Sequence, residues 1–241
     1  MSVIPTKKRP NSNQFYHIQI FKEDIVYKRR GRYHDVKYIK KPTEDDTKVS
    51  TRGEIKSFYK KSRLRLLHQI RNTQHQFKQF ITLTYPSEYP RDGKIVKAHL
   101  NKFLTGIRQK FKDVHYVWVF EAQTRGAPHF HILLNIELPT ELKSDQHGSF
   151  YFSEVWSKRW SKITGHKNNE KHIRHGLRID PISDNNTNRL ASYMAKYYTK
   201  NEQKVFKHDF FGCGRFWGAS RELTVPISQG VYKAQDMVIR P

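Results

Sequence analysis

The stretch HYVWVFEAQTRGAPHFHILLNI, residues 115–136, contains the clearest structural signal in this chain of 241 residues. Apolar and aromatic residues fill both of its ends, and its middle holds Arg125 and Gly126, which suit a turn. Two strands joined by so short a connection pair antiparallel. We therefore predict strands at 115–121 and 129–136 that form a hairpin inside a sheet.

Segments on both sides of this hairpin show the periodicities of further strands and helices. Alternating or short β-branched runs predict strands at 14–21, 33–40, 79–84, 173–180 and near 215–225. Apolar residues at helical spacing predict helices at 53–72, 95–111, 151–163 and from a cap at Asp184 or Asn185 to about Thr199. Because helices interleave with an antiparallel pair, the predicted fold class is α+β, a central antiparallel sheet with packed helices.

The chain is strongly basic, with 45 Lys and Arg residues against 22 Asp and Glu and a formal net charge of +23. Such a charge predicts attraction to polyanions, nucleic acid first and an acidic membrane surface second. No run of about 18 apolar residues is present to span a membrane, and the N-terminus lacks the apolar segment of a secretory signal. The single cysteine, Cys213, excludes a disulfide framework and a cysteine-rich zinc site. We expect an intracellular protein that acts on nucleic acid.

Two dense basic runs lie in the first third of the chain, at 28–32 and 60–65. A solvated surface would explain either run alone. No comparable acidic blocks are present to pair with them, so contact with DNA phosphates is the favoured interpretation. The loop-like segment 41–47 is expected to separate an N-terminal extension from the core. We predict a basic extension at 1–75, in contact with DNA and packed on the core, and a core domain at 76–241.

The tripeptide His129-Phe130-His131 offers two metal ligands on one side of a strand. Alternate residues of a strand point the same way, so both imidazoles face one side and Phe130 the other. A lone pair of this kind is also common in cores and on surfaces. If the turn centres on Arg125, however, Glu121 lies across from His129 and can supply a third ligand. Nitrogen and oxygen ligands predict a divalent ion, Mn²⁺ or Mg²⁺, with zinc as an alternative.

A second constellation is the sequence YMAKYYTK, which begins at Tyr193. On a helix, Tyr193 and Tyr197 lie one turn apart on one face, whereas Tyr198 points away. Lys196 flanks the pair, and Lys200 falls nearly in line with Tyr193. Because a phenol titrates near pH 10, ammonium groups and a nearby metal would favour the phenolate that nucleophilic attack requires. An ordinary amphipathic helix with aromatic core residues is the alternative interpretation.

In this order, FITLTYP (80–86), GAPHFHILL (126–134) and YMAKYYTK (193–200) resemble the three motifs of the HUH endonucleases. More narrowly, they resemble the two-tyrosine rolling-circle replication initiators of single-stranded DNA phages and plasmids. The phrase GRFWGASR (214–221) is similar to one that often follows the tyrosine helix in such initiators. The resemblance covers about residues 80–222.

This resemblance implies a set of site residues and a reaction. The implied metal ligands are His129, His131 and Glu121, and the implied catalytic residues are Tyr193, Tyr197, Lys196 and Lys200. One tyrosine would nick single-stranded DNA, leaving a 5′-phosphotyrosyl link and a free 3′-OH, and the second would rejoin strands. The implied metal is Mn²⁺ or Mg²⁺, and the implied fold is a ferredoxin-like or RNA-recognition-type sheet. The third tyrosine, Tyr198, makes the assignment within this cluster less clean.

The same resemblance implies a biological setting. The DNA partner would be a single-stranded origin hairpin or nick site, and a host helicase or polymerase would act with the protein in the cytoplasm of a bacterial cell. No membrane partner is expected. Two other functions stay open. A HUH transposase or relaxase would share the chemistry, and a non-catalytic module would bind nucleic acid by stacking bases on exposed aromatic residues.

Overall fold

The chain forms two compact units. The computed structural model describes residues 15–22, 24–30, 55, 58–146, 148–183, 187–196, 206, 209–223, 225 and 228–233. The larger unit is Gly53–Val225, and the smaller one consists of Met1–Arg52 and Pro226–Pro241. The functional division at residue 75 that we drew from the sequence stays a prediction.

A seven-stranded sheet with the order β6-β7-β8-β3-β5-β4-β9 forms the larger unit. Its strands are β3 (Gln79–Thr84), β4 (Tyr116–Ala122), β5 (Pro128–Leu134), β6 (Glu141–Asp145), β7 (Gly148–Phe152), β8 (Leu177–Pro181) and β9 (Trp217–Ala219). All neighbouring strands are antiparallel. The predicted hairpin is confirmed as β4 and β5, and each of these two strands has a neighbour on both sides.

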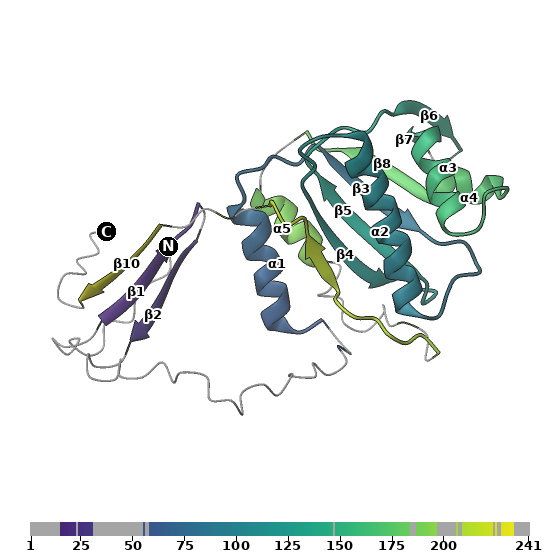
Figure 1. Ribbon diagram of the computed structural model, residues 1–241. Coiled ribbons are helices and arrows are strands. Elements are labelled where there is room, and N and C mark those ends of the chain that lie inside the picture. Colours follow the sequence, from purple (N-terminus) through teal and green to yellow (C-terminus); the bar gives the residue numbers. More distant parts are fainter. Residues whose placement is uncertain are drawn as a thin grey trace. The chain divides into compact units, whose positions relative to one another are not determined.

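Helices cover both faces of this sheet (Figure 1). They are α1 (Lys60–Asn72), α2 (Gly93–Lys110), α3 (Glu154–Ile163), α4 (Glu170–His175) and α5 (Thr187–Lys196). Helices α2 and α3 share one core with the sheet, whereas α1 and α5 pack together on the other face. The α+β fold class predicted from the sequence is therefore confirmed. Among the described helices, none combines the length and apolar character needed to cross a membrane.

Alternation along β5 divides its side chains between the two faces. Phe130 and Ile132 are fully buried in the larger core, beside Phe103 of α2 and Trp160 of α3. The ring of Phe130 stacks on that of Phe120, with centroids 4.9 Å apart. The prediction that Phe130 points away from its two histidine neighbours thus holds, and the aromatic rings give this face most of its packing.

The opposite face of β5 changes character along its length. Leu133 lies in a smaller core with Leu66 of α1 and Met194 of α5. Toward the start of the strand the same face carries His129 and His131 instead. The face covered by α1 and α5 therefore begins as an apolar core and ends in a polar group.

The turn between β4 and β5 is held in place by hydrogen bonds of its own and to β3. Gly126 has a φ of 79°, a left-handed conformation that glycine adopts without strain. The guanidinium of Arg125 donates to the carbonyl oxygens of Tyr85 and Pro86, just beyond the end of β3. These bonds fix the end of the hairpin next to the end of its neighbouring strand.

Two predicted helices begin later than expected. Residues 55, 58 and 59 are not helical, and α1 starts at Lys60. The ring of Phe58 instead lies 5.8 Å from that of Phe216, so a tertiary contact replaces helical pairing. Helix α3 starts at Glu154, because the residues before it form the β6–β7 hairpin. That hairpin was not predicted, since most of its side chains face solvent and show no apolar alternation.

The strand predicted at 173–180 is wrong in its first part. Residues 170–175 form α4, in which Asn169 caps the backbone N–H of His172 at 2.9 Å, and β8 begins only at Leu177. The strand predicted at 33–40 and the end of the helix predicted to reach Thr199 lie outside the described residues.

The smaller unit holds a three-stranded antiparallel sheet. Its order is β10 (Ser228–Lys233), β1 (Phe15–Ile20), β2 (Ile25–Arg30). Strand β1 confirms the strand predicted at 14–21. The other two strands were not predicted, and part of the basic run 28–32 belongs to β2. Pairing between opposite ends of the chain leaves no local pattern in the sequence.

Stability of the larger unit should depend on Phe130. Phe130→Ala removes a fully buried ring and should lower the free energy of unfolding by about 3–5 kcal/mol. Phe211→Ala is the control, because the Phe211 side chain is 58% exposed and its loss should cost less than about 0.5 kcal/mol. Urea unfolding followed by tryptophan fluorescence measures both. Equal losses in the two variants would contradict the central role of the β5 core face.

Candidate metal centre

Three neighbouring strands bring the candidate ligands together. In the β4–β5 pair Glu121 lies opposite His129, which is the register expected from a turn centred on Arg125. On the other side of β5, Thr84 lies opposite His129 and Thr82 opposite His131. Each histidine therefore has a threonine beside it on β3, and the carboxylate approaches from β4.

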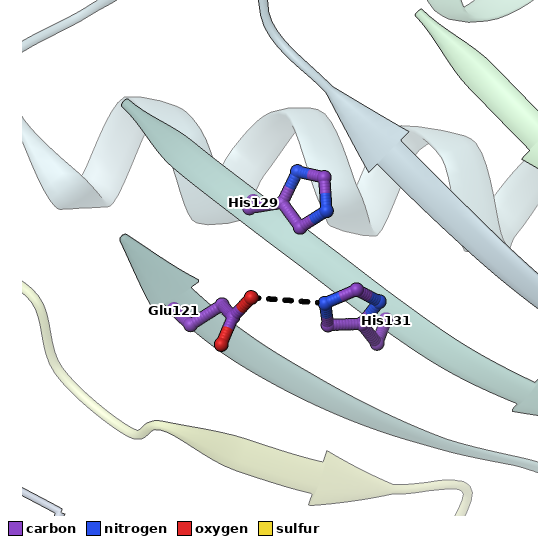
Figure 2. A group of neighbouring side chains, drawn as sticks. All are labelled: Glu121, His129 and His131. Carbon is purple, nitrogen blue, oxygen red and sulfur yellow. Dashed lines mark hydrogen bonds and ion pairs between the residues drawn. The ribbon is translucent and has the colours of Figure 1, made fainter. Parts of the chain in front are cut away.

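The carboxylate reaches diagonally across the strands. Oε1 of Glu121 lies 3.0 Å from Nε2 of His131, and both side chains are only 4% exposed (Figure 2). The opposite residue in the register is His129, so the length of the glutamate side chain, and not the backbone pairing alone, decides which imidazole it meets. One ligand atom from each of Glu121, His129 and His131 lies within 4.8 Å of the others.

Two threonine hydroxyls orient the imidazoles. Oγ1 of Thr84 lies 3.2 Å from Nδ1 of His129, and Oγ1 of Thr82 lies 3.3 Å from Nδ1 of His131. When Nε2 of a histidine binds a metal, Nδ1 carries the proton and donates it to such a partner. Both hydroxyls are placed to accept that hydrogen bond, which leaves each Nε2 directed to the centre of the group.

The donor set fits a divalent cation. Two imidazole nitrogens and one carboxylate oxygen form a mixed nitrogen–oxygen set that binds transition metals with coordination positions left for substrate. Burial of these three side chains removes competing water, so a positive ion would offset the cost of burying the carboxylate. The group Glu121, His129 and His131 could therefore hold a metal ion, and the donors alone do not select one metal.

A cavity of about 420 Å³ opens over this group. Besides the three candidate ligands it is lined by Thr82 and the wall residues Phe80, Gln123, Thr124, Arg178, Asp180 and Tyr193. Arg178 is the only lysine or arginine among these described lining residues. Its Nε donates to Asp180 at 2.9 Å, while its side chain remains 64% exposed. A substrate phosphate in this cavity would find one cation on its wall.

Tyr193 of α5 lies in the wall of the same cavity. Its ring contacts Phe80 edge-to-face with centroids 5.1 Å apart, and Phe80 in turn stacks on His131 at 5.3 Å. The side chain of Tyr193 is 45% exposed. A row of three rings therefore links the helix to the histidine pair and leaves the phenol accessible.

The structure places the sequence-predicted residues unevenly. It brings Glu121, His129, His131 and Tyr193 to one cavity. Lys196 is the last residue of α5, and its side chain is not described. The remaining predicted residues, Tyr197 and Lys200, together with Tyr198, lie outside the described residues.

Sequence reasoning missed three residues of this site. Thr82 and Thr84 had been assigned only to a core strand, although their spacing of two matches that of the histidines and would have signalled a shared face. Arg178 carries no signal of its own, because it meets the site only through the pairing of β8 with β3.

Comparison with known proteins adds a family to this geometry. No curated protein and no solved structure shows a significant match. A family model for replication-associated proteins of the ORF2 type matches residues 78–202, just over half of the chain. The matched segment contains β3, the β4–β5 hairpin and α5, and so every element that surrounds the candidate metal centre. The chain belongs to this family of replication-associated proteins.

Proposed function

We propose that this protein starts rolling-circle replication by nicking single-stranded DNA at an origin with a tyrosine nucleophile. Membership of a replication-associated family supports a role as a replication initiator. The observation that carries the finer proposal is the cavity that Tyr193 shares with Glu121, His129 and His131. An accessible phenol beside a group able to hold a metal is the arrangement that a covalent phosphoryl transfer needs.

In the proposed reaction each residue of the cavity has one task. A divalent ion held by Glu121, His129 and His131 would polarise the scissile phosphate and lower the cost of its developing charge. The Tyr193 oxygen attacks the phosphorus as its proton leaves, and a Tyr–O–P bond replaces the bond from phosphorus to the 3′ oxygen. The 3′ oxygen takes up a proton and becomes the 3′-OH that a polymerase extends. Arg178 on the cavity wall holds the phosphate in place by charge.

The remaining predicted residues complete the cycle. A helix that continued beyond α5 would place Tyr197 one turn after Tyr193 on the same face. Tyr197 would then cleave after a round of synthesis and allow the strands to be rejoined. Lys196 and Lys200 would hold phosphate near the phenols and favour their ionised form.

A non-catalytic binding module explains less of this site. Such a module needs exposed aromatic residues and basic charge, but it does not need a buried carboxylate beside two histidines that threonines orient. A transposase or relaxase would share the same geometry and differ in its DNA substrate. Formation of a covalent adduct with DNA separates a binder from all of these enzymes.

The first prediction concerns the nucleophiles. Incubation with single-stranded DNA and Mn²⁺ should give a denaturant-resistant adduct, and peptide mapping should place the DNA on Tyr193 or Tyr197. Tyr193→Phe and Tyr197→Phe each keep the ring but remove the attacking oxygen, so each should impair nicking or strand joining, and the double variant should form no adduct. Tyr198→Phe is the control and should behave like the unmodified protein. An adduct that persists in the double variant would refute this assignment.

The second prediction separates metal binding from DNA binding. His129→Ala combined with His131→Ala should abolish cleavage, because no nitrogen ligand remains. The affinity for single-stranded DNA should change little, since it comes mainly from phosphate contacts by lysine and arginine. Gel-based nicking and fluorescence anisotropy measure the two properties. Full cleavage by this variant would show that the metal centre lies elsewhere.

The third prediction concerns the threonines of β3. Thr82→Val and Thr84→Val keep the side-chain shape but remove the hydroxyl that orients Nδ1 of each histidine. Each should weaken Mn²⁺ affinity by about 10–100-fold in isothermal titration calorimetry. Thr124→Val is the matched control, because Thr124 lines the same cavity but lies outside β3. If all three variants bind Mn²⁺ alike, the hydroxyls have no role at the metal.

A further inference from the structure

A second and larger cavity, of about 550 Å³, lies at the end of β3. Its walls are the segment Thr84–Glu88, the side chain of Arg125, and residues of the segment 166–176, which includes α4. We propose that this cavity is a subsite for one nucleotide of the single strand, next to the phosphate at the metal centre. The inference rests on the proposed function and adds to it the path that the DNA takes.

Two side-chain contacts connect this cavity to the first one. Thr84 lines the second cavity, while its hydroxyl contacts Nδ1 of His129 in the wall of the first. Gln123 lines the first cavity, and its Oε1 accepts a hydrogen bond of 3.0 Å from Nε of Arg125, which lines the second. The partition between the cavities is therefore no thicker than a pair of side chains. A strand bound at the metal centre reaches the second cavity with an adjacent nucleotide.

The charge of the lining suits a phosphate. Arg125 and Lys171 both line the cavity, and Glu88 is the only acidic residue among its described lining residues. Lys171 is exposed at the surface of α4, so its ammonium group can move to a ligand without breaking the fold. Cations on flexible stems contribute binding that does not depend on base sequence.

The lining also offers flat rings to a base. His166, His172 and His175 line one wall of the cavity. Burial, and to a lesser degree the neighbouring His166, lowers the pKa of His172 to about 4, so its ring is neutral near pH 7. Unstacked bases bind to aromatic and histidine rings of this kind. Cations beside imidazoles match a nucleotide, which has an anionic and a planar part.

The floor of the cavity is already ordered without a ligand. The hydroxyl of Tyr85 lies 3.0 Å from Nδ1 of His99. The indole N–H of Trp160 donates to the carbonyl oxygen of Thr84 at 2.9 Å. Thr164 contacts Nε2 of His172 at 3.1 Å. A cavity whose walls are fixed beforehand loses less entropy when a ligand binds.

The matched variants Lys171→Ala and Lys167→Ala test the subsite. Both lysines are exposed and lie in the segment 166–176, but only Lys171 lines the cavity. Affinity for an oligothymidine of about ten nucleotides is measured by anisotropy in EDTA, over a range of salt concentrations. Losing one phosphate contact to a single strand should make the slope of log affinity against log salt shallower by about 0.7. We expect this change for Lys171→Ala and none for Lys167→Ala, and identical slopes in the two variants would overturn the proposal.

Photo-crosslinking locates the contact independently. An oligothymidine that carries one iodouracil should crosslink to a peptide within 166–176 or 84–88, and Lys171→Glu should reduce that crosslink while Lys167→Glu should not. Crosslinks confined to other peptides would overturn the subsite. Competition by thymidine monophosphate as tight as binding of the oligothymidine would also overturn it, because the cavity would then be a mononucleotide site.

The two proposals can fail separately, because both of these measurements are made without metal and without cleavage. If the protein never nicks DNA while Lys171→Ala still changes the salt slope, the nuclease proposal fails and the subsite stands. If the protein nicks DNA while the lysine variants and the crosslinks show no preference for the cavity, the subsite fails and the nuclease proposal stands.

Discussion

The pairing of β5 with β3 on one side and β4 on the other is the constraint on which the site depends. A slip of one residue in either pair would turn every side chain of a strand to the opposite face. His129 and His131 would then enter the aromatic core, and Phe130 would face the cavity. The register is strongly determined because Phe130 and Ile132 are fully buried on the other face. The packing of one face of the sheet thus positions the chemistry of the other.

That division explains how the fold tolerates a buried carboxylate and two buried histidines. Polar groups without hydrogen-bond partners are costly in an interior. Here Glu121 meets His131, and each histidine meets a threonine of β3. The apolar contacts that stabilise the unit lie mainly with α2 and α3, on the opposite face. The site can therefore be arranged for binding, while stability is supplied elsewhere.

Patterns within a single strand could be predicted from the sequence, and contacts between distant segments could not. The hairpin, the common face of His129 and His131 and the position of Glu121 across from them follow from a period of two and a short turn. The diagonal contact from Glu121 to His131 depends on side-chain length and sheet twist. Arg178 reaches the cavity only because β8 pairs with β3. Strand β10 pairs with β1 from the opposite end of the chain, and no local pattern records this.

The end of β3 joins the metal group to the path of the DNA. Thr84 is the last residue of this strand, and it contacts His129 with its hydroxyl while its carbonyl oxygen accepts a hydrogen bond from Trp160. Immediately after it, the chain turns away from the sheet as the wall of the second cavity, where Arg125 holds the carbonyl oxygens of Tyr85 and Pro86. Any shift of a bound strand in that cavity would therefore act on the backbone that carries Thr84, and through its hydroxyl on the orientation of His129. In the proposed reaction, correct seating of the neighbouring nucleotide and correct alignment of a metal ligand become one structural event.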